Sequence, residues 1–454
     1  MKKRLLNTAL GFGLSAFIAG TAYVAPAAAQ TIDINVWSRQ DTSGPLRPGN
    51  LITAGEILNR TLEAAGSEVR VNVIVTSSPA PGFDEDALQL LKVFAIGEGP
   101  DIFIAAHEWI GEFARNGYAW NLEEHIASRP EFYADIIPAL WGSTLFDGER
   151  YAIPQDAEAR MFFYNKKLMR QAGISEDDIE SLPQRVLDGE FTLADLSALA
   201  KKVVDNSDAE FGILHRPSKG PDYLMIFNAY GSSFLDPESG KLLLEEDKLA
   251  AAFKWFAGNV KMGVTPANNT AMDWDAIRSA FYKDDKAVFW MYGIWDLARA
   301  FAAGVPEDEE GYFKQMGWIA SPAVVRGGTP NSLTHPIVYA VSALSENREL
   351  AATIVGLASS AELNTLHAIG SFHIGIKNAQ LGIPAYAENW ALRRATELLK
   401  ITQFMPNHPD FGRLNGIIYT ALQGVETGRL SSAEAAEFVI DEAQGQFSKN
   451  LMVK

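Results

Sequence analysis

The chain has 454 residues, no cysteine and a formal net charge of −17. The absence of cysteine excludes disulfide bonds, thiolate zinc sites and thiol nucleophiles, and the acidic balance argues against binding to nucleic-acid phosphates or anionic lipid. One hydrophobic core supports roughly 250 to 300 residues, so this length predicts two domains.

The first 29 residues have the pattern of an export signal. Three cations, Lys2, Lys3 and Arg4, precede an apolar stretch over residues 9–19, and a run of alanines ends at Ala29. We expect cleavage at that point and a periplasmic protein of 425 residues, with no cysteine to carry a lipid anchor. The alternative is an uncleaved membrane anchor, but glycines interrupt a segment that would need roughly 20 mostly apolar residues.

The next part of the chain alternates strand and helix patterns. Residues 33–37 and 71–75 alternate and are β-rich, which predicts strands, and the apolar spacing of residues 51–65 predicts a helix between them. An amphipathic helix over residues 85–96 ends at glycines, and a strand follows at 101–105. This alternation predicts an α/β fold with a largely parallel sheet.

A junction between two lobes is predicted after this sheet. Three charged residues, Asp156, Glu158 and Arg160, stand directly before the apolar run 161–163. A solvated loop would not need such a run, and a buried strand would not ordinarily begin with such charges. The segment therefore fits a chain that crosses from one core into another.

The remainder of the chain also mixes strands with helices. Asn165 is suited to cap a helix, and Ser431 with Glu434 forms a possible capping box. Residues 318–321 resemble a return crossing. Further helices are expected at residues 193–204, 223–230, 350–357, 388–401, 416–424 and 431–446, and strands at 211–214 and 285–292. The second lobe is therefore expected to be α/β as well.

No motif for catalysis or cofactor binding stands out. The chain has no phosphate-binding Gly-x-x-x-x-Gly-Lys loop, no Gly-x-Ser-x-Gly elbow and no His-Glu-x-x-His helix. Its seven histidines are scattered, with His367 and His373 the closest pair, so a metal cluster would need residues from distant positions. We expect no metal and no cofactor. A glycosidase with a pair of catalytic carboxylates stays an open alternative, because the distance between two carboxylates in space is not visible in a sequence.

Four segments, taken in order, resemble one protein family. They are GPDIF at 99–103 with Trp109 and Gly117 after it, the stretch from Asp147-Gly148 to the Tyr-Asn-Lys at 164–166, AVFWMYGIW at 287–295, and MPN at 405–407. Their order and spacing make the chain similar to the family 1 sugar-binding proteins of bacterial ABC importers, the maltose-binding-protein-like group. The similarity spans nearly the whole chain after the export signal.

This resemblance implies two α/β lobes, a hinge of crossing segments and a ligand in the cleft between the lobes. Residues 30–150 plus about 320–365 would form the first lobe, and 151–319 plus about 366–454 the second. The implied function is the periplasmic binding component of an ABC importer for an oligosaccharide or glycoside. It would act as a monomer that delivers its ligand to the membrane permease. The alternative is an exported carbohydrate-active enzyme, a lyase or glycosidase.

The resemblance also implies two principal ligand contacts. Glu158 stands where the relatives place a carboxylate on sugar hydroxyls, and the alternative is an ion pair with Arg160. Trp295 matches a ring at the base of the cleft, where stacking on a pyranose would contribute roughly 1 kcal/mol. The alternative for Trp295 is a core tryptophan, and we expect Trp295 rather than Trp290 in the site.

Five other positions are candidates on the two cleft walls, three of them implied by the resemblance and two by their position alone. Asp41 and Glu108 match sugar-binding acids of the relatives, and Trp274 matches an aromatic residue of their second lobe. Arg39 and Gln40 are candidates because they follow the first strand, where loops line a cleft. A solvated loop or a structural role is the alternative for these residues.

The C-terminal helix departs from the family pattern. Asn415 replaces a stacking tryptophan, with Arg413 nearby, and Ala105 replaces another aromatic residue. These departures favour a smaller or more polar glycoside over a long glucan. His215, Arg216 and Lys219 are expected in a loop over the second lobe and are candidates for binding an acidic substituent.

Overall fold

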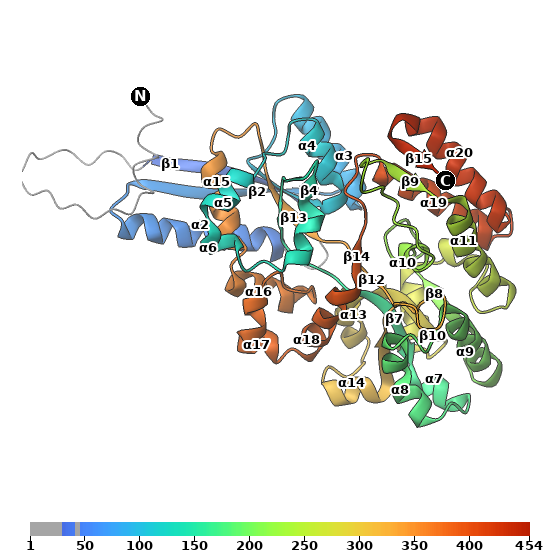
Figure 1. Cartoon of the computed structure of the whole chain (residues 1–454). Helices are drawn as coiled ribbons and strands as arrows, with labels where there is room; N and C mark the ends of the chain where they lie inside the picture. Colours follow the sequence, from blue (N-terminus) through green and yellow to red (C-terminus); the bar gives the residue numbers. More distant parts are fainter. Residues whose placement is uncertain (1–29, 41–45) are drawn as a thin grey trace, which may run out of the picture.

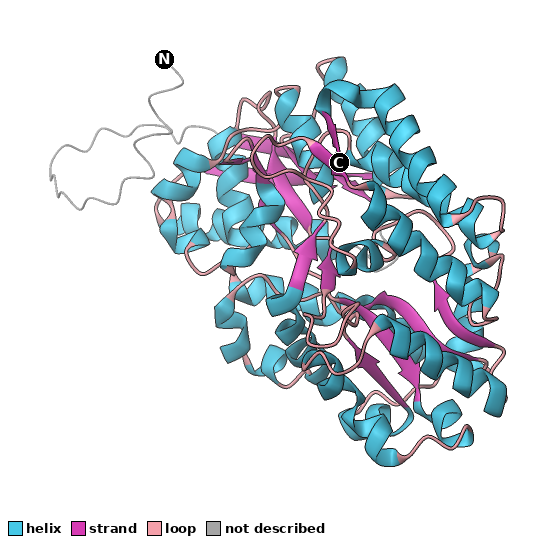
Figure 2. Ribbon diagram, turned by 45° about the vertical axis from the view of Figure 1, so that its right-hand side comes forward, coloured by secondary structure: helices cyan, strands magenta, loops and turns pink. Residues whose placement is uncertain are grey.

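The computed structural model describes residues 30–40 and 46–454, which form two lobes side by side (Figure 1). Each lobe contains a β-sheet with helices around it (Figure 2), so the predicted α/β fold class is confirmed. The expected export signal, residues 1–29, lies outside the described residues. Within the described ranges, no helix has the length and apolar character needed to cross a bilayer.

The first lobe is built on a five-stranded sheet of order β2-β1-β3-β13-β6. β1 (Gln30–Arg39) lies between β2 (Val69–Ser78) and β3 (Ile102–Ala106) and is parallel to both, as predicted. β13 (Ile337–Val341) returns from the second lobe and is antiparallel to β3, and β6 (Ile153–Pro154) is antiparallel to β13. The carboxyl ends of β1 and β3 therefore lie at one edge of the sheet, which faces the second lobe (Figure 1).

Helices cover this sheet with apolar faces. α2 (Leu46–Ala64) packs against β2 and α15 (Arg348–Ala358), and it buries Leu51 and Leu58, which lie two turns apart. The other elements of this part of the chain are α3 (Phe83–Ala95), α4 (Ile110–Arg115), α5 (Glu123–Ser128), α6 (Pro130–Tyr133), β4 (Leu145–Phe146) and β5 (Glu149–Arg150). The predicted β-α-β beginning is confirmed.

The second lobe has a four-stranded sheet of order β11-β7-β10-β8. β7 (Arg160–Asn165) runs antiparallel to β10 (Ala287–Gly293) and to β11 (Met316–Ile319), whereas β8 (Phe211–His215) is parallel to β10. The largely parallel arrangement therefore does not extend to this lobe, because β7 enters it from the first lobe in the opposite direction. The expectation of a return crossing at residues 318–321 is also corrected, since β11 belongs to this sheet.

Predicted caps begin two helices of the second lobe. Asn165 Oδ1 accepts a hydrogen bond from the Leu168 N–H at 3.1 Å, and Ser431 with Glu434 forms the predicted capping box. The helices are α7 (Lys166–Gln171), α8 (Glu176–Leu187), α9 (Leu193–Asn206), α10 (Leu224–Ala229), α11 (Glu246–Lys261), α12 (Trp274–Arg278), α13 (Leu297–Ala302), α14 (Glu309–Gln315), α19 (Phe411–Glu426) and α20 (Ser432–Phe447). A short parallel pair, β9 (Leu242–Leu244) and β15 (Leu451–Val453), joins the C-terminus to this lobe.

Three crossing segments connect the lobes. Residues 155–159 lead from β6 into β7, and β12 (Ser332–Thr334) lies on the return path to β13. The third crossing contains β14 (Thr402–Phe404), which pairs in parallel with β12, and is preceded by α16 (Ala361–Ser371), α17 (Pro384–Ala387) and α18 (Trp390–Glu397). The Glu158 N–H donates to Thr334 Oγ1 at 2.9 Å, so the first two crossings are tied together.

Candidate functional site

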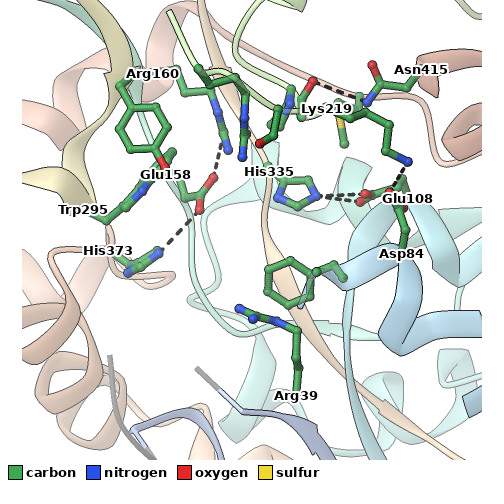
Figure 3. Close-up of a pocket in the computed structure, with 18 of the residues that line it drawn as sticks. Arg39, Asp84, Glu108, Glu158, Arg160, Lys219, Trp295, His335, His373 and Asn415 are labelled. Atoms are coloured by element: carbon green, nitrogen blue, oxygen red, sulfur yellow. Dashed lines mark hydrogen bonds and ion pairs between the residues drawn. The ribbon is translucent and has the colours of Figure 1, made fainter. Parts of the chain in front are cut away.

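A cavity of about 670 Å³ lies between the lobes and the crossing segments, a volume typical of small-molecule sites. Side chains from both lobes and from the crossings line it (Figure 3). They include Arg39, Asp84 and Glu108 of the first lobe, Arg160, Lys219, Trp295 and Asn415 of the second, Glu158 and His335 of the crossing segments, and His373 directly after α16.

The segment that leads into β7 places two opposite charges in the cavity wall. Glu158 and Arg160 are 5% and 2% exposed, and Arg160 Nη1 lies 2.6 Å from Glu158 Oε2. Burial alone would raise the pKa of Glu158, but the charge of Arg160 and the contact with His373 outweigh burial and lower the pKa. The carboxylate is therefore ionised at neutral pH. The ion pair considered as the alternative to ligand contact exists, and both of its partners also line the cavity.

A buried carboxylate connects Arg160 to a second arginine. Asp222 Oδ1 accepts from Arg160 Nε at 3.0 Å, and Asp222 Oδ2 accepts from Arg216 Nη1 at 2.6 Å. The Arg216 guanidinium also lies over the rings of Trp274 and Tyr292, at 5.5 and 5.9 Å from their centroids. Two guanidinium groups are thus fixed in the wall as donors for an oxygen-rich ligand.

Trp295 follows β10 and places a half-buried indole ring in the cavity wall. A Cβ atom on Gly293 would lie 1.8 Å from Trp295 Cζ3, so this position of the ring requires glycine. Arg160 Cζ lies 4.7 Å from a ring centroid of Trp295, and His373 stacks at 6.0 Å with the planes 13° apart. Trp290, in contrast, is fully buried in the core of the lobe.

The first-lobe wall brings together residues that are far apart in the sequence. The turn after β3 forms η1 (His107–Trp109), which presents Glu108 to the cavity. His335 Nε2 lies 2.9 and 2.8 Å from the two Glu108 oxygens. Burial alone would raise the pKa of Glu108, but the charge and hydrogen bond of His335 lower it to about 2. Burial lowers the pKa of His107 to about 4.

One ion pair joins the two lobes across the cavity. Lys219, in the loop before α10, pairs with Asp84 in the first turn of α3 (Figure 3). Asp84 Oδ1 also accepts from the indole N–H of Trp109 at 2.9 Å. On α19, Asn415 Oδ1 accepts from the Tyr223 hydroxyl at 2.6 Å. The lobes are therefore in contact around the cavity.

A second group of histidines and a carboxylate lies beside the cavity in the hinge. The ligand atoms of Asp156, His367 and His373 lie within 4.8 Å of one another. An arginine is already among them, because Arg47 Nη2 lies 2.6 Å from Asp156 Oδ2 and 3.3 Å from His373 Nε2. Burial alone would raise the pKa of Asp156, but Arg47 holds it well below the usual range. Burial lowers the pKa of His367 to about 4.

The predicted site residues divide into two groups. Those that line the cavity are Arg39, Glu108, Glu158, Trp295 and Asn415, together with Arg216 and Lys219. Gln40 and Arg413 lie outside the cavity wall, the latter paired with Asp410, and Trp274 lies behind Tyr292 at 5.4 Å between ring centroids. Asp41 lies outside the described residues.

Sequence reasoning missed two residues that shape the cavity. Asp84 stands among the acids that ordinarily begin a helix, so its sequence position suggests only a favourable helix start. His335 stands in a Thr-His-Pro stretch directly before a strand. A polar residue next to a proline and just before an apolar strand is the signal that would have marked it.

Comparisons with known proteins agree with one another. The family described as bacterial extracellular solute-binding protein matches residues 55–364. The chain is 26% identical over 221 residues to the maltotriose-binding protein of Pyrococcus abyssi, with 48% of this chain and 43% of that protein covered, which is less than half of the relative's length. It is 23% identical over 360 residues to the galactooligosaccharide-binding protein of Bacillus subtilis, with 77% of each chain covered.

Solved structures share the two-lobed fold. The sugar-binding protein MalE from Xanthomonas citri has a TM-score of 0.74 at 17% identity, with 92% of this chain and 98% of that chain covered. The GacH receptor of Streptomyces glaucescens, solved unliganded and with acarbose, has a TM-score of 0.69 at 19% identity, with 91% and 97% covered. At such identities the likeness establishes the fold.

Proposed function

The chain belongs to the family of bacterial extracellular solute-binding proteins, and from this premise we propose that it binds a sugar in the interlobe cavity for an ABC importer. The proposed ligand is an oligosaccharide or glycoside. The names of the Pyrococcus abyssi and Bacillus subtilis relatives support this class. Members of this family bind solutes, so we expect release of an unchanged ligand rather than the turnover of a lyase or glycosidase.

The observation that carries the proposal is the combination of Trp295 and Glu158 in one wall. An indole face stacks on the C–H groups of a pyranose, and an ionised carboxylate accepts strong hydrogen bonds from hydroxyl groups. Arg160 joins the two, since its guanidinium contacts both the indole ring and the carboxylate. A sugar ring uses both kinds of contact at once.

A small or polar glycoside suits this cavity better than a long glucan. The wall is rich in charged groups, and a volume of about 670 Å³ suits a small ligand. On α19, Asn415 offers an amide that is already bonded to Tyr223, instead of an aromatic face. Fewer stacking surfaces mean fewer sites for consecutive glucose rings.

Binding is proposed to work by closure of the lobes about the three crossings. A ligand that touches Glu108 in the first lobe, Trp295 in the second and Glu158 in the hinge makes all its contacts only when the lobes are closed. Moving the closed population from 1:99 to 99:1 requires about 5.5 kcal/mol of preference for that form. The proposed lobe boundaries lie near residues 150 and 320. The third lies at the crossing that contains β14 rather than near residue 365, because α16 packs against α2 of the first lobe.

We also infer that the protein works in the periplasm after loss of residues 1–29 and docks as a monomer on the permease subunits of the importer. The signal-like pattern of those residues and the extracellular family support this inference. No enzymatic step is required, because delivery follows from the difference in affinity between the open and closed forms.

A thermal-shift screen of residues 30–454 against maltose, trehalose, sucrose, galactosides and polyols tests the proposal. A sugar at 100 times its Kd stabilises the folded protein by about 2.7 kcal/mol, which raises Tm by several degrees. Chromatography of the recovered sugar then separates a binder from an enzyme. An unchanged sugar supports the proposal, whereas a cleaved product, or the absence of a shift with every sugar, contradicts it.

A further inference from the structure

The first-lobe wall of the cavity brings together three side chains with metal-binding atoms. They are His107, Glu108 and His335, all buried, with ligand atoms within 4.8 Å of one another. The sheet places them there, because Ala106 at the end of β3 pairs with Ile337 at the start of β13. The two histidines therefore leave the sheet at the same edge, although they are far apart in the sequence.

The hydrogen bond of His107 fixes the tautomer of its ring. His107 Nε2 lies 3.0 Å from the backbone carbonyl oxygen of Met405, and a carbonyl only accepts, so Nε2 carries the hydrogen. In the neutral ring Nδ1 then holds a lone pair. This side chain is 0% exposed, and Nδ1 has no hydrogen-bond partner among the described residues.

The lone pair of His107 faces a carboxylate. His107 Nδ1 lies 3.5 Å from Glu108 Oε2, and neither atom has a hydrogen to offer the other. Two acceptors that face each other in a buried site are unfavourable unless a cation lies between them. A hydrogen bond from His335 satisfies Glu108 but leaves His107 Nδ1 without a partner. A metal ion that displaces the His335 Nε2 proton to solvent satisfies all three groups.

We propose that His107 Nδ1, Glu108 and His335 Nε2 form a binding site for one transition-metal ion, with zinc as the best fit. Zinc binds histidine nitrogen and carboxylate oxygen at about 2.0 to 2.2 Å, so neighbouring ligands of a tetrahedral site lie about 3.4 Å apart. The 3.5 Å between His107 Nδ1 and Glu108 Oε2 already matches this separation. His335 Nε2, now 2.8 Å from the same oxygen, reaches this separation from Glu108 Oε2 when their distance grows by about 0.6 Å.

The ligand types favour zinc over the common alkaline-earth ions. Magnesium and calcium prefer sites made of oxygen atoms, whereas imidazole suits zinc and its neighbours in the first transition row. Three protein ligands leave a coordination position free. Glu108 and His335 line the cavity, so this position faces it and is open to an oxygen atom of a bound guest.

The hinge cluster of Asp156, His367 and His373 provides an internal comparison. Its ligand atoms also lie within 4.8 Å of one another, but the Arg47 guanidinium already bonds Asp156 and contacts His373. A resident cation repels a metal ion. We therefore expect no metal in the hinge cluster, and its histidines offer matched controls.

The test uses residues 30–454, freed of metal with a chelator and kept without sugar, so its outcome does not depend on the proposed function. Calorimetric titration with zinc chloride should give one ion per chain. Cobalt chloride should give a visible absorption spectrum distinct from that of free aqueous cobalt. Glu108→Gln and His335→Asn each remove one ligand and should weaken zinc binding at least about tenfold.

The control is His367→Asn, which removes a buried histidine of the hinge cluster and should leave zinc affinity unchanged. Equal affinity in the wild type, Glu108→Gln and His335→Asn would overturn the proposal, and so would loss of binding in His367→Asn alone. Thermal melting without metal checks that each variant folds. If a variant does not fold, the cobalt spectrum of the wild-type protein tests the proposal by itself. A spectrum identical to that of the free ion would mean that the site does not exist.

Discussion

Lys219 and Asp84 form an ion pair that spans the cavity from the second lobe to the first (Figure 3). Both side chains are partly exposed, at 33% and 23%, so their attraction is worth at most about 1 kcal/mol. It acts only when the lobes are together, because the two residues belong to different lobes. This pair therefore favours the closed form by a small amount before any ligand is present.

Replacing Lys219 with methionine should increase the open fraction of the ligand-free protein. The expected sign is a larger radius of gyration in small-angle X-ray scattering, together with slightly weaker ligand binding. Lys248→Met is the matched control, since Lys248 pairs with Glu245 inside one lobe at a similar exposure. An equal change in both variants would mean that the interlobe pair does not favour closure.

Glu158→Gln should weaken sugar binding by about ten- to a hundredfold, the usual worth of hydrogen bonds to a charged group. The amide keeps the size of the side chain but accepts weaker hydrogen bonds from hydroxyl groups. Calorimetric titration with the best sugar of the screen measures the change. Glu180→Gln removes an ion pair between the exposed Glu180 and the buried Lys166, neither of which lines the cavity, and should leave affinity intact. Normal sugar binding by Glu158→Gln would mean that Glu158 does not contact the ligand.

Trp295→Ala should lower sugar affinity at least about tenfold, because it removes an aromatic face that stacks on the ring. Trp274→Ala is its control, a half-buried tryptophan of the same lobe that lies outside the cavity wall. The change in tryptophan fluorescence on sugar binding should also be lost in Trp295→Ala and retained in Trp274→Ala. The reverse pattern would place the stacking surface at Trp274.

Gly293→Ala should weaken binding without removing any group that touches the ligand. The added Cβ would lie 1.8 Å from Trp295 Cζ3, so the indole ring must leave its position. In the last turn of α11, Gly258 has no atom within 4 Å of an added Cβ, and Gly258→Ala should raise stability by about 0.5 kcal/mol. Titration and thermal melting of both variants distinguish these effects, and unchanged affinity in Gly293→Ala would contradict the role given to the ring position.

Stability should fall as pH falls from about 6.5 to about 4. Burial lowers the pKa of His367 to about 4 in the folded state, whereas an unfolded histidine has a pKa of about 6.5. Between these values the unfolded chain binds a proton that the folded chain does not, so acid favours unfolding. Because the pKa of Asp156 is also lowered in the folded state, its protonation causes a further loss of folding stability at lower pH. As pH falls, Tm should decline less steeply in His367→Asn than in the wild type. An equal decline in both would mean that His367 does not cause the loss of stability.

Short-range patterns determined much of the fold and part of the candidate site. Alternating residues 33–37 belong to β1, and Ser431 with Glu434 caps α20 as their spacing predicts. Hydrophobic period and capping act within a few residues, so a single segment contains them. Glu158 and Trp295 were placed by motif order along the chain, and both line the cavity.

Only the tertiary structure decided which distant side chains meet. Glu108 and His335 are 227 residues apart and share a hydrogen bond, while Lys219 reaches Asp84 from the other lobe. The spacing within one segment contains no information on such contacts, because they depend on how three crossings carry the chain between the lobes. The direction of β7 in its sheet could not be predicted from the sequence for the same reason. Strand pairing depends on the packing of the whole lobe and not on the residues of one strand.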